Sequence, residues 1–305
     1  MARVYSSDDR IIKTRRIKFN YPSGSLQKHY VNGDLVMSHI VAVLSAMFPE
    51  GEDFFVRSVR NFADDITDPT LRKQIAGFTG QEVTHGREHR ALNERLAQMG
   101  YPTRRVDRGV KRGLAMQMRV FSPHYNLAST AALEHYTATL AEILLTDPRA
   151  QELLGGGQAG GRSGNGGQAG GRSGNHSEVR SLLLWHAFEE SEHRAVAFDV
   201  FRATGGSERM RVWAMRRTTF FFLTATIMQT IASMLGDRAT YNPVRTAKSI
   251  AALRHSPFLS RDVVRRIRAY NRPGFHPDDF DNTEILQTWS AELFGEQGQL
   301  VDHLR

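Results

Sequence analysis

The feature that most limits how this chain can fold is a single polar level within four apolar helical patterns. In each pattern, apolar residues recur at alternating spacings of four and three, which is typical of helices that pack around a bundle core. At one level, polar residues replace the expected apolar ones, and these are Glu52, Glu82, His85, Glu134, Glu190 and His193. Burying such groups without a partner would be costly, and a pair of divalent cations removes that cost.

The arrangement of these residues along the chain indicates a two-metal site. One Glu from each of two helices, with Glu-x-x-His from each of the other two, is the ligand pattern of ferritin-like di-iron and di-manganese proteins. At i and i+3, both side chains of a Glu-x-x-His motif leave one helix face, so one metal ion can be gripped by both. We therefore predict an all-α fold, a ferritin-like four-helix bundle with additional N- and C-terminal helices, that holds two metal ions. Iron is the first expectation, with manganese and zinc as alternatives.

Two more histidines lie on the same helical patterns. His89 follows His85 by one turn, and His186 precedes Glu190 by one turn. Because the two helices should run antiparallel, we expect both histidines at the same end of the metal pair, which makes one metal richer in nitrogen donors. We expect at least one of them to coordinate metal directly; the alternative is that both donate hydrogen bonds to ligating carboxylates.

Some neighbouring acidic residues remain open alternatives. Glu189 could replace Glu190 as a ligand, because it lies four residues before His193. Asp199 is a further candidate for the metal or for its surroundings. Glu88 and His135 lie off the apolar patterns, so we expect them to support the ligands or to be exposed.

The rest of the chain divides by composition into three parts. Residues 1–33 are predicted to form an irregular N-terminal arm, 34–205 the metal-binding bundle and 206–305 a C-terminal helical extension. Helix starts are indicated by Asp68-Pro69 and Ser122-Pro123, and Pro49 is expected to open a new helix. A glycine-rich decapeptide occurs twice in tandem within 156–175, and its composition predicts a flexible linker.

Composition excludes several kinds of site. The 305 residues contain no cysteine, which excludes thiolate zinc sites, iron–sulfur clusters and cysteine nucleophiles in this chain. The polar, charged N-terminal residues lack the apolar stretch of a secretory signal, so a cytoplasmic location is expected. The net charge is +8, but no nucleic-acid-binding motif accompanies it, and we expect no nucleic-acid partner.

One uncharged stretch, Thr218 to Leu235, allows two interpretations. It is at the lower limit for crossing a bilayer, and it contains several threonines. We favour a buried core helix. The alternative is a peripheral membrane contact, because arginines flank both ends. The sequence leaves an oligomeric assembly open.

Three motif regions and one later segment resemble a known family. The segments Phe48–Arg60, Phe78–Arg90, Trp185–Asp199 and Tyr270–Pro277 are similar to those of bacterial proteins described as predicted metal-dependent hydrolases. The resemblance spans most of residues 17–290 and departs at the glycine-rich repeat. It implies a bound metal and a hydrolytic reaction.

The ligand pattern supports three functional hypotheses. The first is a di-iron oxidase or oxygenase that activates O₂ and acts on an apolar small molecule, with electrons from an external donor or from the substrate. The second is a two-metal hydrolase that uses a metal-bound hydroxide. The third is a non-enzymatic metal-binding protein. Phenylalanines near the ligands suggest an apolar substrate, although core packing accounts for them equally well.

Overall fold

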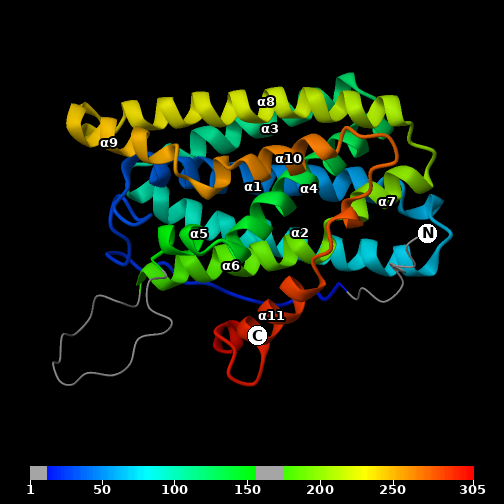
Figure 1. Ribbon diagram of the computed structural model, residues 1–305, viewed down its shortest axis with the longest axis horizontal. Helices are drawn as coiled ribbons and strands as arrows, with labels where there is room; N and C mark the ends of the chain where they lie inside the picture. Colours follow the sequence, from blue (N-terminus) through cyan, green and yellow to red (C-terminus); the bar gives the residue numbers. More distant parts are fainter. Residues whose placement is uncertain (1–11, 156–174) are drawn as a thin grey trace.

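The computed structural model describes residues 12–155 and 175–305, and within these ranges the chain is helical (Figure 1). The described residues form no β-strand; an isolated β-bridge joins Ile17 to Leu304. The all-α prediction is therefore confirmed. The tandem repeat, apart from Asn175, which begins a helix, lies outside the described residues.

Eleven α-helices account for most of the described chain. In order they are α1 Leu35–Arg60, α2 Pro69–Gln98, α3 Thr103–Val120, α4 Pro123–Thr146, α5 Pro148–Leu153, α6 Asn175–His193, α7 Val196–Ala203, α8 Glu208–Leu235, α9 Pro243–Leu253, α10 Arg261–Ala269 and α11 Thr283–Phe294. Short 3-10 helices, among them Arg238–Tyr241 after α8, connect some of them.

The two Pro-based helix starts lie where the sequence places them. The Asp68 side chain accepts a hydrogen bond from the Thr70 N–H at the start of α2, and Ser122 does the same for Tyr125 at the start of α4. In both cases proline occupies the first helical position, where its missing N–H costs nothing.

The prediction that a new helix begins at Pro49 is wrong, because α1 continues through this residue as one helix of 26 residues. Proline cannot donate to the carbonyl four residues earlier, which belongs to Ser45. The side-chain amide of Asn93 in α2 donates to that Ser45 carbonyl instead, at 2.8 Å. A side chain of the neighbouring helix thus replaces the missing hydrogen bond.

The chain that carries Glu190 and His193 forms two helices rather than one. α6 ends at His193, and α7 begins at Val196. The intervening Arg194 is buried, and its Nη1 donates to Glu142 Oε1 at 2.5 Å. The break therefore lies where a charged side chain turns inward to a carboxylate of α4.

Four helices form a closed ring around the polar level. α1 packs against α2, α2 against α6, α6 against α4, and α4 against α1. Figure 1 shows the long helices along the long axis of the molecule, with α1 and α4 in the middle, α3 and α8 along one edge, and α2 and α6 nearer the other. This ring agrees with a four-helix bundle, while a specifically ferritin-like arrangement stays a prediction.

The arm and the C-terminal segment complete the core of the ring. One core cluster joins Phe55 and Phe78 of the ring to Tyr270, and another joins Phe19 of the arm to Trp185 and Leu293. The three segments distinguished by composition therefore share their hydrophobic cores. The arm is extended rather than helical over residues 12–20.

Two glycines of α2 allow the arm to lie against the ring. A Cβ atom at Gly77 would lie 2.4 Å from the Ile12 carbonyl oxygen, and one at Gly80 would lie 2.0 Å from Thr14 Oγ1. Real Cβ atoms do not approach so closely, so any side chain here would push the arm away. These glycines bring the arm within reach of the helices that carry the polar level.

The prediction that Thr218–Leu235 is a buried core helix is wrong, because this part of α8 lies on the surface. Only 17% of its most apolar 18-residue window is buried. Thr218, Thr230 and Ser233 face inward, whereas large side chains such as Phe220 and Ile227 are exposed. By length and composition α8 is the one helix in the described residues that is apolar enough to cross a membrane.

Candidate metal centre

The structure brings together all the predicted ligands at one level of the four-helix ring. α1 contributes one carboxylate, α2 and α6 contribute a Glu-x-x-His pair each, and α4 contributes the remaining carboxylate. The side chains are almost fully buried, and they are Glu52, Glu82, His85, Glu134, Glu190 and His193. His186 of α6 joins them.

These side chains form two groups whose ligand atoms lie within 4.8 Å of one another. The first is Glu52, His85 and His186; the second is Glu82, Glu190 and His193. Glu134 joins the second group, because its Oε2 lies 3.3 Å from His193 Nε2. Glu190 Oε1 lies between the groups, 2.9 Å from His186 Nε2 and 3.6 Å from His193 Nε2.

The sequence predicts that the Glu and the His of each Glu-x-x-His motif bind the same metal ion. In α2, however, Glu82 and His85 lie in different groups. His85 belongs with Glu52, whereas Glu82 Oε1 lies 3.0 Å from His193 Nε2. Residues three apart on a helix are displaced by roughly 4.5 Å along its axis. That displacement is close to the ~3.5–4 Å between the ions of two-metal sites, so the motif spans both positions.

Unpartnered buried atoms show that this donor set suits metal ions. Both carboxylate oxygens of Glu52, Glu82 and Glu134 are buried without a hydrogen-bond partner. The same is true of Glu190 Oε2, His85 Nδ1 and His193 Nε2. Buried polar atoms are rarely left without partners. Here nine of them face one another on four helices, which is the arrangement expected of side chains that ligate cations.

Without metal ions, burial and mutual repulsion disfavour the ionised forms of these carboxylates. Burial, and then the neighbouring carboxylates, raises the pKa values of Glu52 and Glu82 well above the usual range. Burial and Glu190 raise the pKa of Glu134 to about 7. Burial and the nearby His186 hold the pKa of His85 well below its usual range. Divalent cations would offset this mutual repulsion and favour the ionised carboxylates.

Hydrogen-bond direction distinguishes His186 from His89. Ser45 Oγ donates to Asn93 Oδ1 at 2.8 Å, so the 2.9 Å contact between Ser45 Oγ and His89 Nδ1 requires the proton on the histidine. Neutral His89 then has a free Nε2 lone pair, which accepts from His186 Nδ1 at 2.7 Å. His186 Nε2 is left without a proton and points toward the carboxylates.

His186 is therefore available as a ligand, while His89 orients it from outside. Two imidazoles, from His85 and His186, lie in one group, and one, from His193, lies in the other. One group is therefore richer in nitrogen donors than the other, as the sequence predicts. Asn93 also lines a surface cavity of about 560 Å³ beside α3, so the chain of contacts ends near solvent.

An arginine of the N-terminal arm holds the outer side of two predicted ligand histidines, His85 and His193. Arg15 Nη1 donates to Glu189 Oε1 at 2.9 Å, and Glu189 Oε2 lies 3.0 Å from His85 Nε2. Because Glu189 occupies the Nε2 side of His85, the Nδ1 side faces the ligand group. Burial raises the pKa of Glu189 to about 7 although Arg15 acts against it.

The second branch from Arg15 reaches His193. Arg15 donates to both oxygens of Glu192, at 2.6 and 2.8 Å. Gln81 Nε2 donates to Glu192 Oε2, and Gln81 Oε1 accepts from His193 Nδ1 at 2.8 Å. This fixes the proton on His193 Nδ1 and leaves Nε2 for the ligand group. Such outer contacts orient metal-binding histidines and raise their basicity.

Arg15, Gln81 and Glu192 are contacts of the predicted ligands that the sequence pattern does not predict. Arg15 lies between the rings of Phe188 and Phe294, with its guanidinium carbon 4.9 and 4.6 Å from their centroids. No local pattern distinguishes an arginine in an irregular arm. The glycines at 77 and 80 were the available signal, since paired glycines in a helix indicate a close approach.

The remaining candidates lie outside the ligand groups. Glu189 supports His85 rather than replacing Glu190. Asp199 accepts a hydrogen bond from His276 Nε2 at 2.8 Å and is not among the gathered ligands. Glu88 and His135 are buried. Glu88 accepts a hydrogen bond from the Phe19 N–H, and His135 donates one to the Arg266 carbonyl. They anchor the arm and α10 rather than the metal centre.

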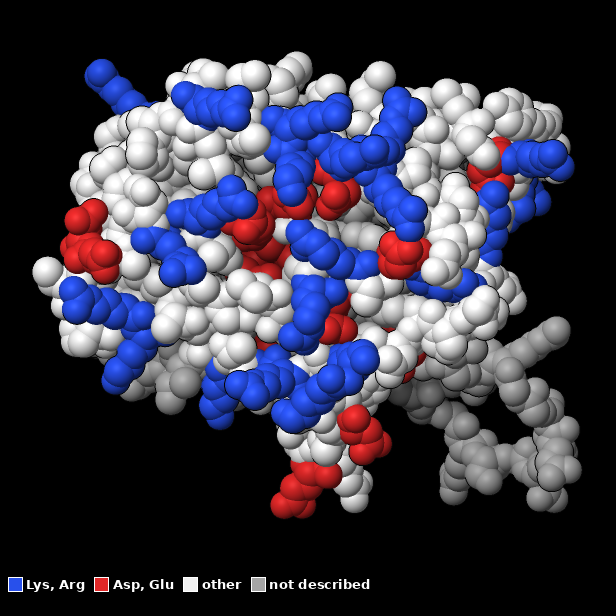
Figure 2. All heavy atoms as spheres, turned by 180° about the vertical axis from the view of Figure 1, so that it is seen from behind, with Lys and Arg blue, Asp and Glu red and all other residues white. Residues whose placement is uncertain are grey.

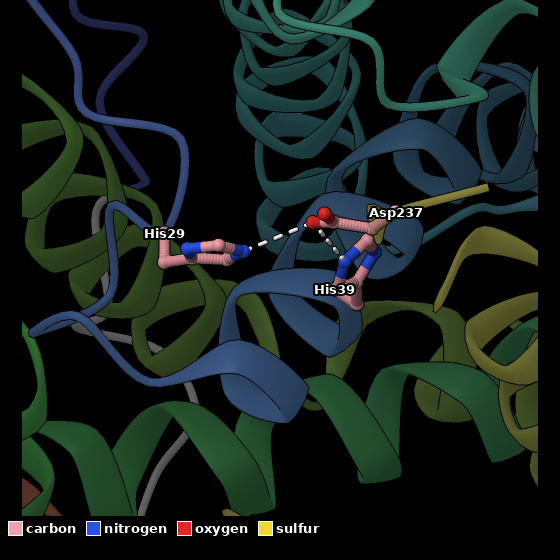
Figure 3. Close-up of side chains that lie close together, drawn as sticks. All are labelled: His29, His39 and Asp237. Carbon is pink, nitrogen blue, oxygen red and sulfur yellow. Dashed lines mark hydrogen bonds and ion pairs between the residues drawn. The ribbon is translucent and has the colours of Figure 1, made fainter. Parts of the chain in front are cut away.

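A third cluster of His and Asp side chains could also hold a metal ion, but its members form hydrogen bonds with one another (Figure 3). His29, His39 and Asp237 converge, with each histidine Nε2 within 3.3 Å of Asp237 Oδ2. Arg245 Nη2 donates to His29 Nδ1 at 2.7 Å, so neutral His29 carries its proton on Nε2 and donates it to Asp237. Unlike the metal centre, this cluster is internally satisfied, and it fastens the arm and α1 to the end of α8.

The family comparison agrees with this donor set. A family model described as "Predicted metal-dependent hydrolase" matches residues 13–155 and 168–281. The match includes the ligands on all four helices, as well as Arg15 and Gln81. No curated protein and no solved structure matches the chain significantly.

Proposed function

Because this chain belongs to the family of predicted metal-dependent hydrolases, we propose that it is a hydrolase that works through two divalent metal ions. Glu52, His85 and His186 would hold one ion. Glu82, Glu134 and His193 would hold the other, with Glu190 placed between them. The chain is then a metal-dependent enzyme whose small-molecule substrate is bound at the ring of α1, α2, α4 and α6.

One observation carries this proposal: nine buried ligand atoms without hydrogen-bond partners meet at a single level of the ring. A structural polar network would satisfy its own atoms, as the His29–His39–Asp237 cluster does. Ions in such a two-metal site lower the pKa of coordinated water and polarise the bond to be hydrolysed.

Aromatic side chains around the imidazoles exclude bulk water. Trp185 packs edge-on against His85, with centroids 4.8 Å apart, and Phe78 against His193 at 5.0 Å. Phe48 lies against both His89 and His186, at 4.7 Å from each. Electrostatic interactions are stronger in such a dry site than in water. The protein thereby orients the ligands and keeps unproductive water away.

A second function is favoured by the donor set itself. Four glutamates and two histidines, one Glu on each of two helices and Glu-x-x-His on each of the other two, are the ligands that di-iron carboxylate proteins use, and His186 adds a third histidine here. An O₂-activating oxidase acting on an apolar small molecule, with an external electron donor, would use the same residues. The two functions differ in metal preference and in their need for oxygen.

The experiment compares metals and oxygen in one protein preparation. Metal-free protein is reloaded with Zn²⁺, with Mn²⁺, or with Fe²⁺ under anaerobic conditions, and tested against ester and phosphoester probes. We expect hydrolysis with Zn²⁺ or Mn²⁺ that is independent of oxygen, and its loss in Glu190→Ala. Glu94→Ala, an exposed glutamate of the same helix as Glu82, serves as the control.

The contrary result is equally specific. Stoichiometric O₂ consumption by the Fe²⁺ form, with no hydrolysis by any metal form, would reject the hydrolase in favour of the oxidase. Failure of the wild-type chain to retain about two ions per monomer would reject both.

The histidine assignment has a separate test. His186→Ala removes a nitrogen donor from the first group, so we expect metal affinity to fall by at least about tenfold. His89→Gln, which preserves a hydrogen-bonding side chain beside His186, should have a smaller effect. Equal metal affinity in wild type and His186→Ala, measured by competition with a chelator, would show that His186 is not a ligand.

A further inference from the structure

The outer side of α8 is a continuous apolar surface. Its large exposed side chains include Trp213, Phe220, Phe221, Ile227, Met228 and Ile231, each at least 48% exposed. They follow helical spacing along one side of the helix, which we call the α8 face. From Trp213 to Ile231 this face is roughly 27 Å long. Apolar surfaces of this size on a folded protein mark interaction sites.

The inner side of α8 is already occupied. Tyr136 of α4 donates to Thr219 Oγ1 at 2.8 Å, and the ring of Phe222 lies 5.4 Å from that of Tyr136. Tyr136 follows the predicted ligand Glu134 by two residues. α8 is therefore held on the ring that carries the metal centre, and its outer side is left without a partner in the described chain.

Positive charge surrounds the α8 face. Residues 103–120 and 208–254, which contain α3, α8 and α9, carry fourteen Lys and Arg against three Asp and Glu, a net +11. The whole chain has a net +8, so all the other residues together carry −3. Figure 2 shows Lys and Arg side chains gathered just below the largely uncharged upper edge, along which α8 runs.

The basic and apolar side chains belong to one surface. Arg217 Nη1 donates to Gln117 of α3, and Trp213 of α8 packs on Phe121 just after α3. These contacts place the exposed Arg119 beside the start of α8, where Arg209 and Arg216 are also exposed. Trp213 lies at this end, and Tyr241 is exposed beyond the other. Trp and Tyr are enriched where proteins meet the membrane–water interface.

We propose that the α8 face docks on the surface of an anionic lipid bilayer, with α8 lying in the interface and the flanking arginines on lipid phosphates. An apolar helix face bordered by cations is the pattern of interfacial helices. A second copy of the chain is a poorer occupant, because a two-fold interface would bring the basic residues around the α8 face of one copy close to the same residues of the other. The proposal does not depend on which reaction the metal centre performs.

The experiment measures sedimentation of the metal-loaded full chain with lipid vesicles. Phosphatidylcholine vesicles with about 30% phosphatidylserine are compared with pure phosphatidylcholine at low and high salt. We expect binding to the anionic vesicles that weakens as salt rises. Replacing Arg119, Arg209 and Arg216 by Gln should lower the binding constant by about 100-fold, since each charge near the surface contributes roughly fivefold.

A second variant tests the apolar contribution. Phe220→Ser, Ile227→Ser and Met228→Ser together should lower binding by more than about tenfold. The matched controls are Val83→Ser and Lys73→Gln, exposed residues of α2 outside the α8 face, which should bind as the wild type does. Unchanged helicity and metal content show that each variant is folded.

Four outcomes would overturn the proposal. The first is no binding of wild type to anionic vesicles at low salt. The second is wild-type binding by both triple variants. The third is a concentration-dependent dimer without vesicles that the apolar variant abolishes, which would make the α8 face an interface between copies. Resistance to extraction by high salt and alkali would likewise replace interfacial docking with a membrane-spanning helix.

Discussion

The N-terminal arm and α8 both cover the four-helix ring, but they do so with opposite chemistry. They lie toward opposite edges of the molecule in Figure 1. The arm fits over Gly77 and Gly80, and it directs the Arg15 guanidinium inward to two buried carboxylates. α8 turns Thr218, Thr230 and Ser233 inward and leaves many of its large apolar side chains exposed. The irregular segment is connected to the metal centre, and the regular helix faces outward.

This difference shows that regular structure and functional importance need not coincide. A helix of 28 residues contributes no predicted ligand, whereas one arginine of an extended segment reaches the outer nitrogens of two ligand histidines through Glu189 and through Glu192 and Gln81. Changes in the arm should therefore alter the metal centre, and changes on the α8 face should not.

The largest effect is expected from removing a ligand. Glu82→Ala or Glu190→Ala takes away a carboxylate that lies among the ligands of the ring, and each should lose most of the bound metal. Phe220→Ala on the α8 face should keep about two ions per monomer. Metal content by plasma emission spectrometry checks both. Full retention of metal in both glutamate variants would refute the assignment of the centre.

A smaller but still large effect is expected from the arm. Arg15→Met leaves Glu189 and Glu192 buried without their cation, which typically costs about 3–5 kcal/mol of stability. Loss of the outer contacts of His85 and His193 should also weaken metal binding by about 10–100-fold. The exposed neighbour Arg16→Met is the control. Wild-type metal affinity in Arg15→Met would mean that the arm is only a cover.

The pH dependence of stability should also separate the two regions. Burial raises the pKa of both Glu134 and Glu189 to about 7 in the metal-free fold, above the ordinary value of 4.5. Between these values the folded chain keeps protons that the unfolded chain releases, so metal-free stability should fall as pH rises from about 4.5 to 7, by about 3 kcal/mol per group.

Metal loading should remove this fall, because ions stabilise the ionised carboxylates and compete with protons. Thermal unfolding of metal-free and metal-loaded protein between about pH 5 and 8 measures it. Variants of the α8 face should show the wild-type slope. Metal-free protein that becomes more stable toward neutral pH would contradict the burial of these carboxylates.

The smallest effect is expected from the tandem repeat, which lies almost wholly outside the described residues. Deleting one copy of the decapeptide at 156–165 shortens the connection between α5 and α6 without removing any described contact. Loop-closure entropy changes by only about 0.6 kcal/mol for each doubling of length. Helicity by circular dichroism and metal content should stay near the wild-type values, and a loss of metal would show that the repeat takes part in the site.

Helical periodicity was enough to predict which Glu and His side chains meet at one buried level, because such residues at apolar helical positions are costly to bury unless a cation or a polar partner meets them. The same reasoning placed His89 and His186 at one end of the pair. It could not tell which of them faces the carboxylates, since that depends on the proton direction set by Ser45 and Asn93.

Two predictions failed where contacts outweighed local pattern. The proline at position 49 predicts a helix start, but Asn93 of another helix satisfies the carbonyl that Pro49 leaves free. The apolar composition of Thr218–Leu235 predicts burial. The buried residues of this stretch are Thr218, Thr230, Ser233 and Met234, so composition could not show which side faces the protein.

The segment carrying Arg15 is itself held by residues that come much later in the chain. The Lys18 N–H donates to the His303 carbonyl at 3.1 Å, the Arg305 N–H donates to the Arg16 carbonyl at 2.8 Å, and the Phe19 ring lies 5.2 Å from that of His303. During synthesis Arg15 leaves the ribosome before every described α-helix, whereas residues 303–305, which hold its segment, leave after all of these helices. Because chains fold progressively as they emerge, the four helices of the ring can pack together before Arg15 contacts Glu189 and Glu192. The outer contacts of His85 and His193 are therefore expected to form last, once residues 303–305 have left the ribosome.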